Sequence, residues 1–83
     1  MNNIESGILF FNSPWCAPCK KVKDGLTEEL SKELNVFSFD AVKDVNVFGH
    51  YQVASVPTFI KLDGGNETKR HVGGMSIEEL KKF

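Results

Sequence analysis

The segment SPWCAPCKKVK, Ser13–Lys23, holds both cysteines of the chain, and only two residues separate them. A disulfide across so short a loop constrains the unfolded chain little, so the pair would be a weak structural crosslink. In a chain of 83 residues with no other cysteine, this spacing is typical of a redox-active dithiol or of half of a metal site. The flanking sequence indicates where in a fold this chemistry would lie.

An apolar strand precedes the segment and an amphipathic helix follows it. Gly7–Phe11 reads Gly-Ile-Leu-Phe-Phe, the continuous apolar pattern of a strand that is covered on both faces. Beyond the segment, apolar residues recur at helical spacing and predict one helix with a single buried stripe of Cys19, Val22, Leu26 and Leu30. The cysteines are therefore expected at a strand-to-helix junction, with Cys16 near the helix N-terminus and Cys19 facing inward.

The remaining sequence predicts a second strand, a short helix, a hairpin and a final helix. Val36–Val42 has the apolar weight of a central strand, and a weak amphipathic helix follows at residues 44–51. Thr58–Leu62 and Glu67–Val72 flank the turn residues Asp-Gly-Gly-Asn and predict a hairpin whose second strand is polar enough for a sheet edge. Ser76 and Glu79 have the capping-box spacing of a helix start.

This order of elements predicts one α/β domain that spans residues 1–83. A βαβ unit followed by a ββα unit gives a mixed four-stranded sheet with three helices on both of its faces.

Composition argues against several classes of function. The formal net charge is −1, which leaves no basic surface for a nucleic-acid backbone. No apolar run approaches the length of a membrane span, and residues 1–6 lack the basic start and apolar core of a secretory signal. We therefore expect a soluble cytoplasmic monomer with no nucleic-acid or membrane partner.

The sequence Trp-Cys-Ala-Pro-Cys-Lys, Trp15–Lys20, resembles the active-site motif of the thioredoxin family, with Ala17 where that motif usually has glycine. Tyr51–Thr58 resembles the segment around the family's cis-proline, which Pro57 matches, and the strand after it also agrees. Val72–Gly74 resembles the glycine-bearing loop beside the substrate groove. The resemblance covers nearly the whole chain from the first strand onward, but most of the family's usual N-terminal strand and helix is missing.

The resemblance implies a thioredoxin-like fold and an enzyme that reduces protein disulfides through a reversible Cys16–Cys19 dithiol. Cys16 would attack the substrate disulfide as a thiolate, which the helix N-terminus and nearby lysines favour, and Cys19 would resolve the mixed disulfide. The implied substrate-binding residues are Trp15, Val56, Pro57, Gly73 and Gly74, and the implied supporting residues are Ala17, Pro18 and Lys20.

The resemblance also implies partners but no bound cofactor or metal. An NADPH-linked thioredoxin reductase or glutathione would recharge the disulfide, and the implied substrates are disulfide-bearing proteins, with ribonucleotide reductase as one candidate.

The sequence departs from the family around the second cysteine. Phe10 stands where the family usually has a buried aspartate, and Val36 or Ser38 replaces the lysine expected opposite it. Deprotonation of Cys19 would then depend on solvent or on another group, such as Asp40.

Three alternatives stay open. A glutathione-dependent, glutaredoxin-like oxidoreductase fits the short N-terminus, with Gly73–Gly74 as a glutathione-binding loop. A non-catalytic metal module would use the two cysteines with other ligands, although His50 and His71 lack ligand spacing. Trp15 can also be read as a core-filling residue without a role in substrate binding.

Overall fold

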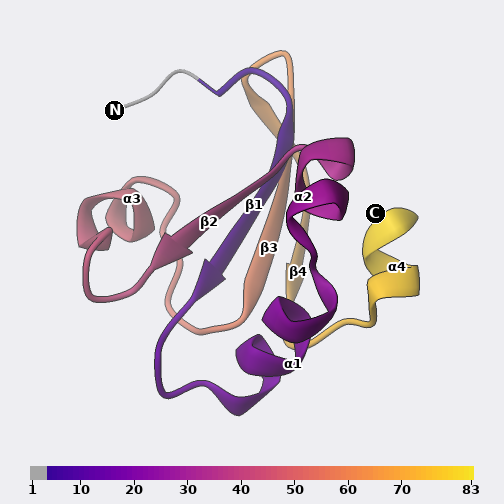
Figure 1. Ribbon diagram of the computed structural model, residues 1–83. Coiled ribbons are helices and arrows are strands. Elements are labelled where there is room, and N and C mark those ends of the chain that lie inside the picture. The colour runs from indigo at the N-terminus through magenta and orange to yellow at the C-terminus, as the bar shows by residue number, and fades with distance from the viewer. Residues whose placement is uncertain (1–3) are drawn as a thin grey trace.

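The chain folds around a four-stranded sheet with helices on both faces (Figure 1). The computed structural model describes residues 4–83. Residues 1–3, which belong to the segment without a secretory signal pattern, lie outside the described residues. The strands are β1 (Gly7–Asn12), β2 (Val36–Asp40), β3 (Thr58–Asp63) and β4 (Asn66–Val72). The helices are α1 (Ala17–Gly25), α2 (Glu28–Leu34), α3 (Val45–His50) and α4 (Ile77–Lys81).

The sheet has the order β2-β1-β3-β4 and confirms the predicted mixed topology. β1 pairs in parallel with β2 and antiparallel with β3, and β3 pairs antiparallel with β4. The βαβ and ββα units therefore meet along the β1–β3 pair at the centre of the sheet. Both central strands are apolar, whereas β4 is exposed along most of its length, as its polar sequence predicts for an edge.

The apolar run of β1 is buried on both faces of the sheet, as its pattern predicts. Ile8 and Phe10 contribute to a cluster with side chains from α1 and α4, whereas Leu9 and Phe11 pack with residues of α3. Figure 1 shows α3 on one side of the sheet and the other helices on the opposite side. None of the helices in residues 4–83 has both the length and the apolar character needed to cross a bilayer.

The prediction of one helix with a stripe from Cys19 to Leu30 is wrong, because the segment forms two helices. Leu26 leaves the helical backbone, and the Thr27 hydroxyl then accepts a hydrogen bond from the Leu30 backbone N–H at 3.1 Å. Thr27 thus acts as an N-cap that starts α2. The described chain has four helices where three were expected.

The second strand is shorter than predicted and lies at an edge of the sheet. β2 ends at Asp40, whose carboxylate accepts hydrogen bonds from the backbone N–H groups of Val42 and Lys43 and so forms a turn. The apolar weight of Val36–Val42 suggested a central strand, but β1 is the strand's one partner within residues 4–83. As a result, Phe37 is 36% exposed.

The final helix begins with the predicted capping box. The Glu79 N–H donates to the Ser76 hydroxyl at 3.0 Å, and the Ser76 N–H donates to the Glu79 carboxylate at 3.1 Å. These bonds to Ser76 are the main reason that the pKa of Glu79 lies below its ordinary value of 4.5, and the positive charge of His71 adds to them.

Glu79→Gln is expected to weaken the acid sensitivity of the fold. Because the pKa of Glu79 is lower in the folded chain than in the unfolded chain, the ionised carboxylate stabilises the fold above pH 4.5, and this contribution disappears as the pH falls through the folded pKa. Urea unfolding at several pH values should therefore show a smaller loss of stability below about pH 4.5 for Glu79→Gln than for the parent chain. Glu33→Gln, an exposed change on α2, is the control and should keep the parent's slope. Identical slopes for the parent and Glu79→Gln would contradict the prediction.

Candidate active site

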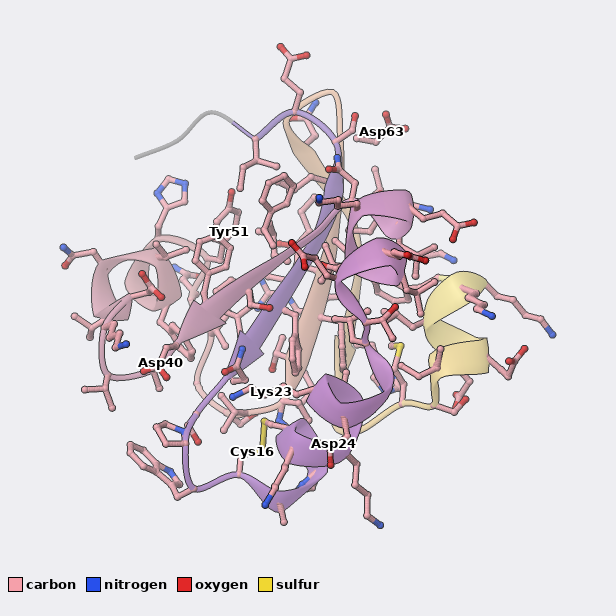
Figure 2. All side chains as sticks on the ribbon, in the orientation of Figure 1. Cys16, Lys23, Asp24, Asp40, Tyr51 and Asp63 are labelled. Carbon is pink, nitrogen blue, oxygen red and sulfur yellow. A yellow bond between two sulfur atoms is a disulfide. The ribbon has the colours of Figure 1, made fainter. Side chains whose placement is uncertain are left out.

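The two cysteines form a disulfide at the junction of β1 and α1 (Figure 2). Their Cα atoms are 5.2 Å apart. Cys16 is the N-cap of α1, and its sulfur accepts a hydrogen bond from the backbone N–H of Cys19 at 3.2 Å. Cys16 is 9% exposed and Cys19 is fully buried, so Cys16 is the residue of the pair that an incoming group can reach.

The first turn of α1 suits a reactive thiol. Pro18 occupies a first-turn position, where its missing N–H leaves no helical hydrogen bond unmade. Unpaired N–H groups and the helix dipole favour negative charge at this end of a helix. Lys20, Lys21 and Lys23 are exposed along the same helix, and Ala17 and Pro18 are exposed beside the disulfide. The surroundings of Cys16 are therefore apolar at close range and positively charged further out.

Trp15 is 73% exposed immediately before Cys16, so the interpretation of this residue as core filling is wrong. An exposed indole beside a disulfide offers a flat surface with one hydrogen-bond donor. Such a surface is suited to contact with another protein.

The segment before β3, which contains Pro57, contacts the segment after β4, which contains Gly73, near the buried cluster that includes both cysteines. The Val56–Pro57 peptide bond is cis, and the Gly73 N–H donates to the Pro57 carbonyl at 2.9 Å. Gly73 has φ +110°, a backbone conformation that favours glycine. Val56 also packs against the cluster that contains Cys16. The structure thus brings together Pro57 and Gly73 from segments that are distant in sequence.

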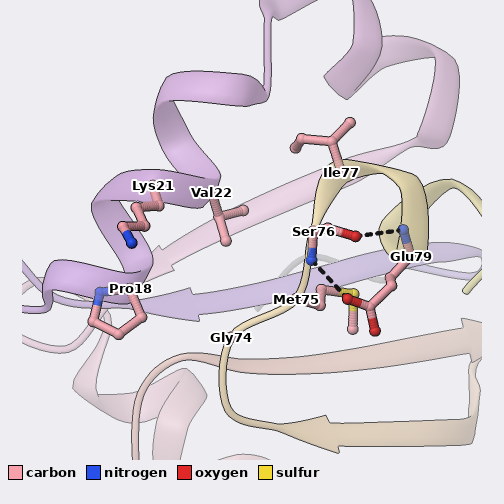
Figure 3. A pocket seen from close by; sticks show the side chains of 8 residues that line it. All are labelled: Pro18, Lys21, Val22, Gly74, Met75, Ser76, Ile77 and Glu79. Atoms are coloured by element: carbon pink, nitrogen blue, oxygen red, sulfur yellow. Dashed lines mark hydrogen bonds between the residues drawn. The ribbon is translucent and has the colours of Figure 1, made fainter.

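Two hollows contain the remaining predicted site residues. The larger, about 380 Å³, lies between α1 and the start of α4 (Figure 3) and is lined by Pro18, Lys21, Val22, Gly74, Met75, Ser76, Ile77 and Glu79. The smaller, about 230 Å³, is lined by Ser13, Trp15, Ala41, Phe48, Val53, Ala54, Ser55 and Val56. The predicted groove residues are therefore divided, with Trp15 and Val56 in one hollow and Gly74 in the other.

Phe10 occupies the core position where the sequence lacks the family's aspartate. Its ring stacks on Phe59 with centroids 5.0 Å apart, in the cluster that also contains both cysteines. The strand register places Ser38, and not Val36, opposite Phe10. The sheet residues that are buried in one cluster with Cys19, namely Ile8, Phe10 and Phe59, are all apolar.

The structure does not support Asp40 as the proton acceptor for Cys19. Hydrogen bonds from the backbone N–H groups of Val42 and Lys43 lower the pKa of the Asp40 carboxyl below its ordinary 3.8. A carboxylate that is stabilised in its ionised form is a weaker base, and these two bonds tie it to the turn after β2.

Sequence reasoning missed two features next to the site. Ser13 is 2% exposed, and its hydroxyl has no hydrogen-bond partner within residues 4–83. Arg70 on β4 donates to the Tyr51 carbonyl at 2.7 Å and makes two 2.8 Å hydrogen bonds to Glu67, so it ties β4 to the end of α3. Glu67 and Arg70 are three residues apart, and the irregular register of β3 and β4 near Leu62 lets both side chains meet. Strand periodicity alone would place them on opposite faces.

Neither His50 nor His71 lines the two hollows described above. The imidazole Nε2 of His71 is 3.1 Å from the Gly74 carbonyl oxygen, whereas His50 is exposed at the end of α3. Within the described part of the chain, no three His, Cys, Asp or Glu side chains are grouped as metal ligands.

Comparisons with known proteins agree on one family. The sequence profile of the thioredoxin family matches residues 1–83. Thioredoxin of Bacillus subtilis is 31% identical over 76 residues, which cover 88% of this chain and 73% of that protein. The bifunctional thioredoxin reductase/thioredoxin of Mycobacterium leprae is 38% identical over 69 residues, which are 80% of this chain but 15% of that longer protein.

A solved structure shows the same relationship in three dimensions. The reduced thioredoxin pre-protein of Schistosoma mansoni superposes with a TM-score of 0.78 at 25% identity, over 98% of this chain and 77% of that one. The fold, the Cys16–Cys19 pair and the matched sequence agree, and the chain belongs to the thioredoxin family of protein-disulfide oxidoreductases.

Proposed function

We propose that this protein works as a reductant of disulfide bonds in other proteins, with Cys16 as nucleophile and Cys19 as resolving thiol. The observation that carries the proposal is the position of Cys16. Its sulfur caps α1 and accepts a hydrogen bond from the Cys19 N–H, and Cys16 is the more exposed residue of the pair, beside an exposed Trp15.

The reaction begins when the Cys16 thiolate attacks one sulfur of the substrate disulfide. The Cys16–substrate bond forms, the substrate S–S bond breaks and one substrate thiolate leaves. The Cys19 thiolate then attacks the Cys16 sulfur, which breaks the mixed disulfide and releases the second substrate thiolate. The substrate gains two electrons, and the protein is left with the Cys16–Cys19 disulfide that is present in the structure.

Substrate binding is proposed to use the backbone that surrounds the disulfide. An extended segment can lie beside Val56–Pro57 and Gly73, where two chain segments already pair through the Gly73–Pro57 hydrogen bond. Trp15 would cover one side of that segment and Gly74 would leave room on the other. The exposed lysines of α1 would favour substrates with acidic residues near the disulfide.

An NADPH-linked thioredoxin reductase is the proposed source of the two electrons that regenerate the dithiol. A reductase and a thioredoxin form one chain in the M. leprae relative, which supports this pairing. We further propose that the protein acts as a cytoplasmic monomer.

Insulin reduction tests both the activity and the source of electrons. The purified protein is supplied with NADPH and thioredoxin reductase in one arm, and with NADPH, glutathione and glutathione reductase in the other. Turnover with the first system is expected. Turnover only in the glutathione arm would contradict the proposed partner and assign the protein a glutaredoxin-like activity. No turnover in either arm would contradict the reductase function itself.

A further inference from the structure

We propose that His71 is a positioning residue for the reduction of protein substrates, because its side chain fixes the peptide that joins Gly73 and Gly74. The inference rests on the proposed function, in which the backbone of a substrate lies beside Gly73, and it names a residue that holds this binding surface in shape. The reaction described above does not use His71.

The imidazole of His71 contacts the loop that follows its own strand. Its Nε2 atom lies 3.1 Å from the carbonyl oxygen of Gly74, three residues further along the chain. A carbonyl oxygen only accepts hydrogen bonds, so the hydrogen of this contact is assigned to Nε2. The contact therefore ties the peptide between Gly74 and Met75 to β4.

The peptide that joins Gly73 and Gly74 lies between two peptides that are held in place. On its N-terminal side, the Gly73 N–H donates to the Pro57 carbonyl at 2.9 Å. On its C-terminal side, His71 holds the Gly74 carbonyl. Glycine has wide backbone freedom, so two glycines in succession would let this peptide rotate if either anchor were lost. The side chain of His71 supplies one of the two anchors.

The imidazole is itself placed by residues of the fold. His71 on β4 is the register partner of Phe59 on β3, and the centroids of their rings are 6.3 Å apart. Phe59 is fully buried in the cluster that contains both cysteines. Hydrogen bonds with Ser76 (Figure 3) and, after them, the charge of His71 lower the pKa of the Glu79 carboxyl, so Glu79 is also near the imidazole. The imidazole is therefore in position before a substrate binds.

The fixed peptide lies next to the turn that carries the two cysteines. A Cβ atom added at Gly74 would lie 3.7 Å from the Cβ atom of Pro18, the residue before Cys19, and Gly74 is exposed. The Gly73–Gly74 peptide can therefore pair with an extended substrate whose disulfide approaches Cys16. A peptide that is already oriented loses less conformational entropy on binding, so His71 should strengthen binding of the substrate backbone without touching the reacting sulfurs.

Two disulfides, one with a peptide backbone and one without, test the role of His71. One is a synthetic peptide with a single internal disulfide, and the other is dithiobis(nitrobenzoate), a small aromatic disulfide. The protein is reduced beforehand and freed of reductant, and its reaction with each disulfide gives a second-order rate constant. His71→Leu removes the donor and should lower the rate constant for the peptide by about fivefold, the effect of one hydrogen bond. The rate constant for the small disulfide should stay unchanged.

A rescue variant separates the hydrogen bond from a general structural effect. His71→Gln keeps a side-chain N–H donor and should restore most of the rate constant for the peptide. His50→Leu, the same change at an exposed position on α3, is the matched control and should leave both rate constants unchanged. An equal loss for both disulfides, or no rescue by His71→Gln, would overturn the proposal. A parent chain that reduces neither disulfide would instead contradict the reductase function and this role with it.

The mobility of the loop gives a second test that needs no turnover. The Gly74 N–H belongs to the fixed peptide, so its NMR order parameter in the parent chain should be about 0.85, the value of a rigid backbone, and should fall clearly in His71→Leu. The Gly65 N–H, in the turn between β3 and β4, is the control and should be the same in both proteins. An order parameter below about 0.6 for Gly74 in the parent chain would overturn the proposal without any variant. An unchanged value in folded His71→Leu would also overturn it.

Discussion

Cys19→Ser is expected to capture a disulfide substrate through Cys16 and not release it. The Cys16 thiolate can still form the mixed disulfide, but no second sulfur remains to break it. Non-reducing electrophoresis after mixing with oxidised insulin should show a covalent adduct. A small dithiol should reduce the mixed disulfide and separate the two proteins. Cys16→Ser should instead lower turnover to the rate of the reductant alone, because Cys19 is fully buried.

The control is the double variant with serine at both positions. It has no cysteine left, so it should form no disulfide-linked adduct with insulin. Adduct formation by Cys16→Ser and not by Cys19→Ser would reverse the roles assigned to the two sulfurs.

Phe10→Ala is expected to lower the free energy of unfolding by about 3–5 kcal/mol, the usual cost of truncating a buried aromatic side chain. Phe10 is fully buried, and its ring stacks on that of Phe59, its register partner on the neighbouring strand β3. Because small domains are often stable by only about 5–15 kcal/mol, this loss would leave a marginal fold. Urea or guanidinium unfolding of the oxidised protein measures the difference.

The matched control for Phe10→Ala is Phe37→Ala on the neighbouring edge strand. Phe37 is 36% exposed, so its truncation should cost clearly less, on the order of 1 kcal/mol. Similar losses for the two variants would contradict the view that the cluster around Phe10 carries the stability of the site.

Elements with strong local signals could be predicted from the sequence. The apolar run of β1, the Asp-Gly-Gly-Asn turn and the Ser76–Glu79 capping box each contain their own signal, and the structure has all three. The break between α1 and α2 also has a signal, because Thr27 precedes two acidic residues. The apolar residues at helical spacing continue across this break, so their pattern predicts one continuous helix in place of two.

Features that depend on distant neighbours could not be read from the pattern. The position of β2 at an edge is set by which strands pair with it, and its own residues suggest a central strand. For the same reason, the motif identifies Cys16 and Cys19 but gives no indication that the buried Ser13 hydroxyl lacks a partner among residues 4–83. Arg70 reaches the end of α3 only because the β3–β4 register is irregular, which local sequence does not reveal.

The central position of β1 has a consequence for synthesis on the ribosome. β1 is the first described element to be made, yet both of its neighbours come later, and β3 is complete only at Asp63. The cluster that buries the cysteines also needs Phe59 and Leu80. The nascent chain therefore carries accessible thiols at least until Leu80 in α4 has been synthesised, because only then can the cluster around the cysteines form.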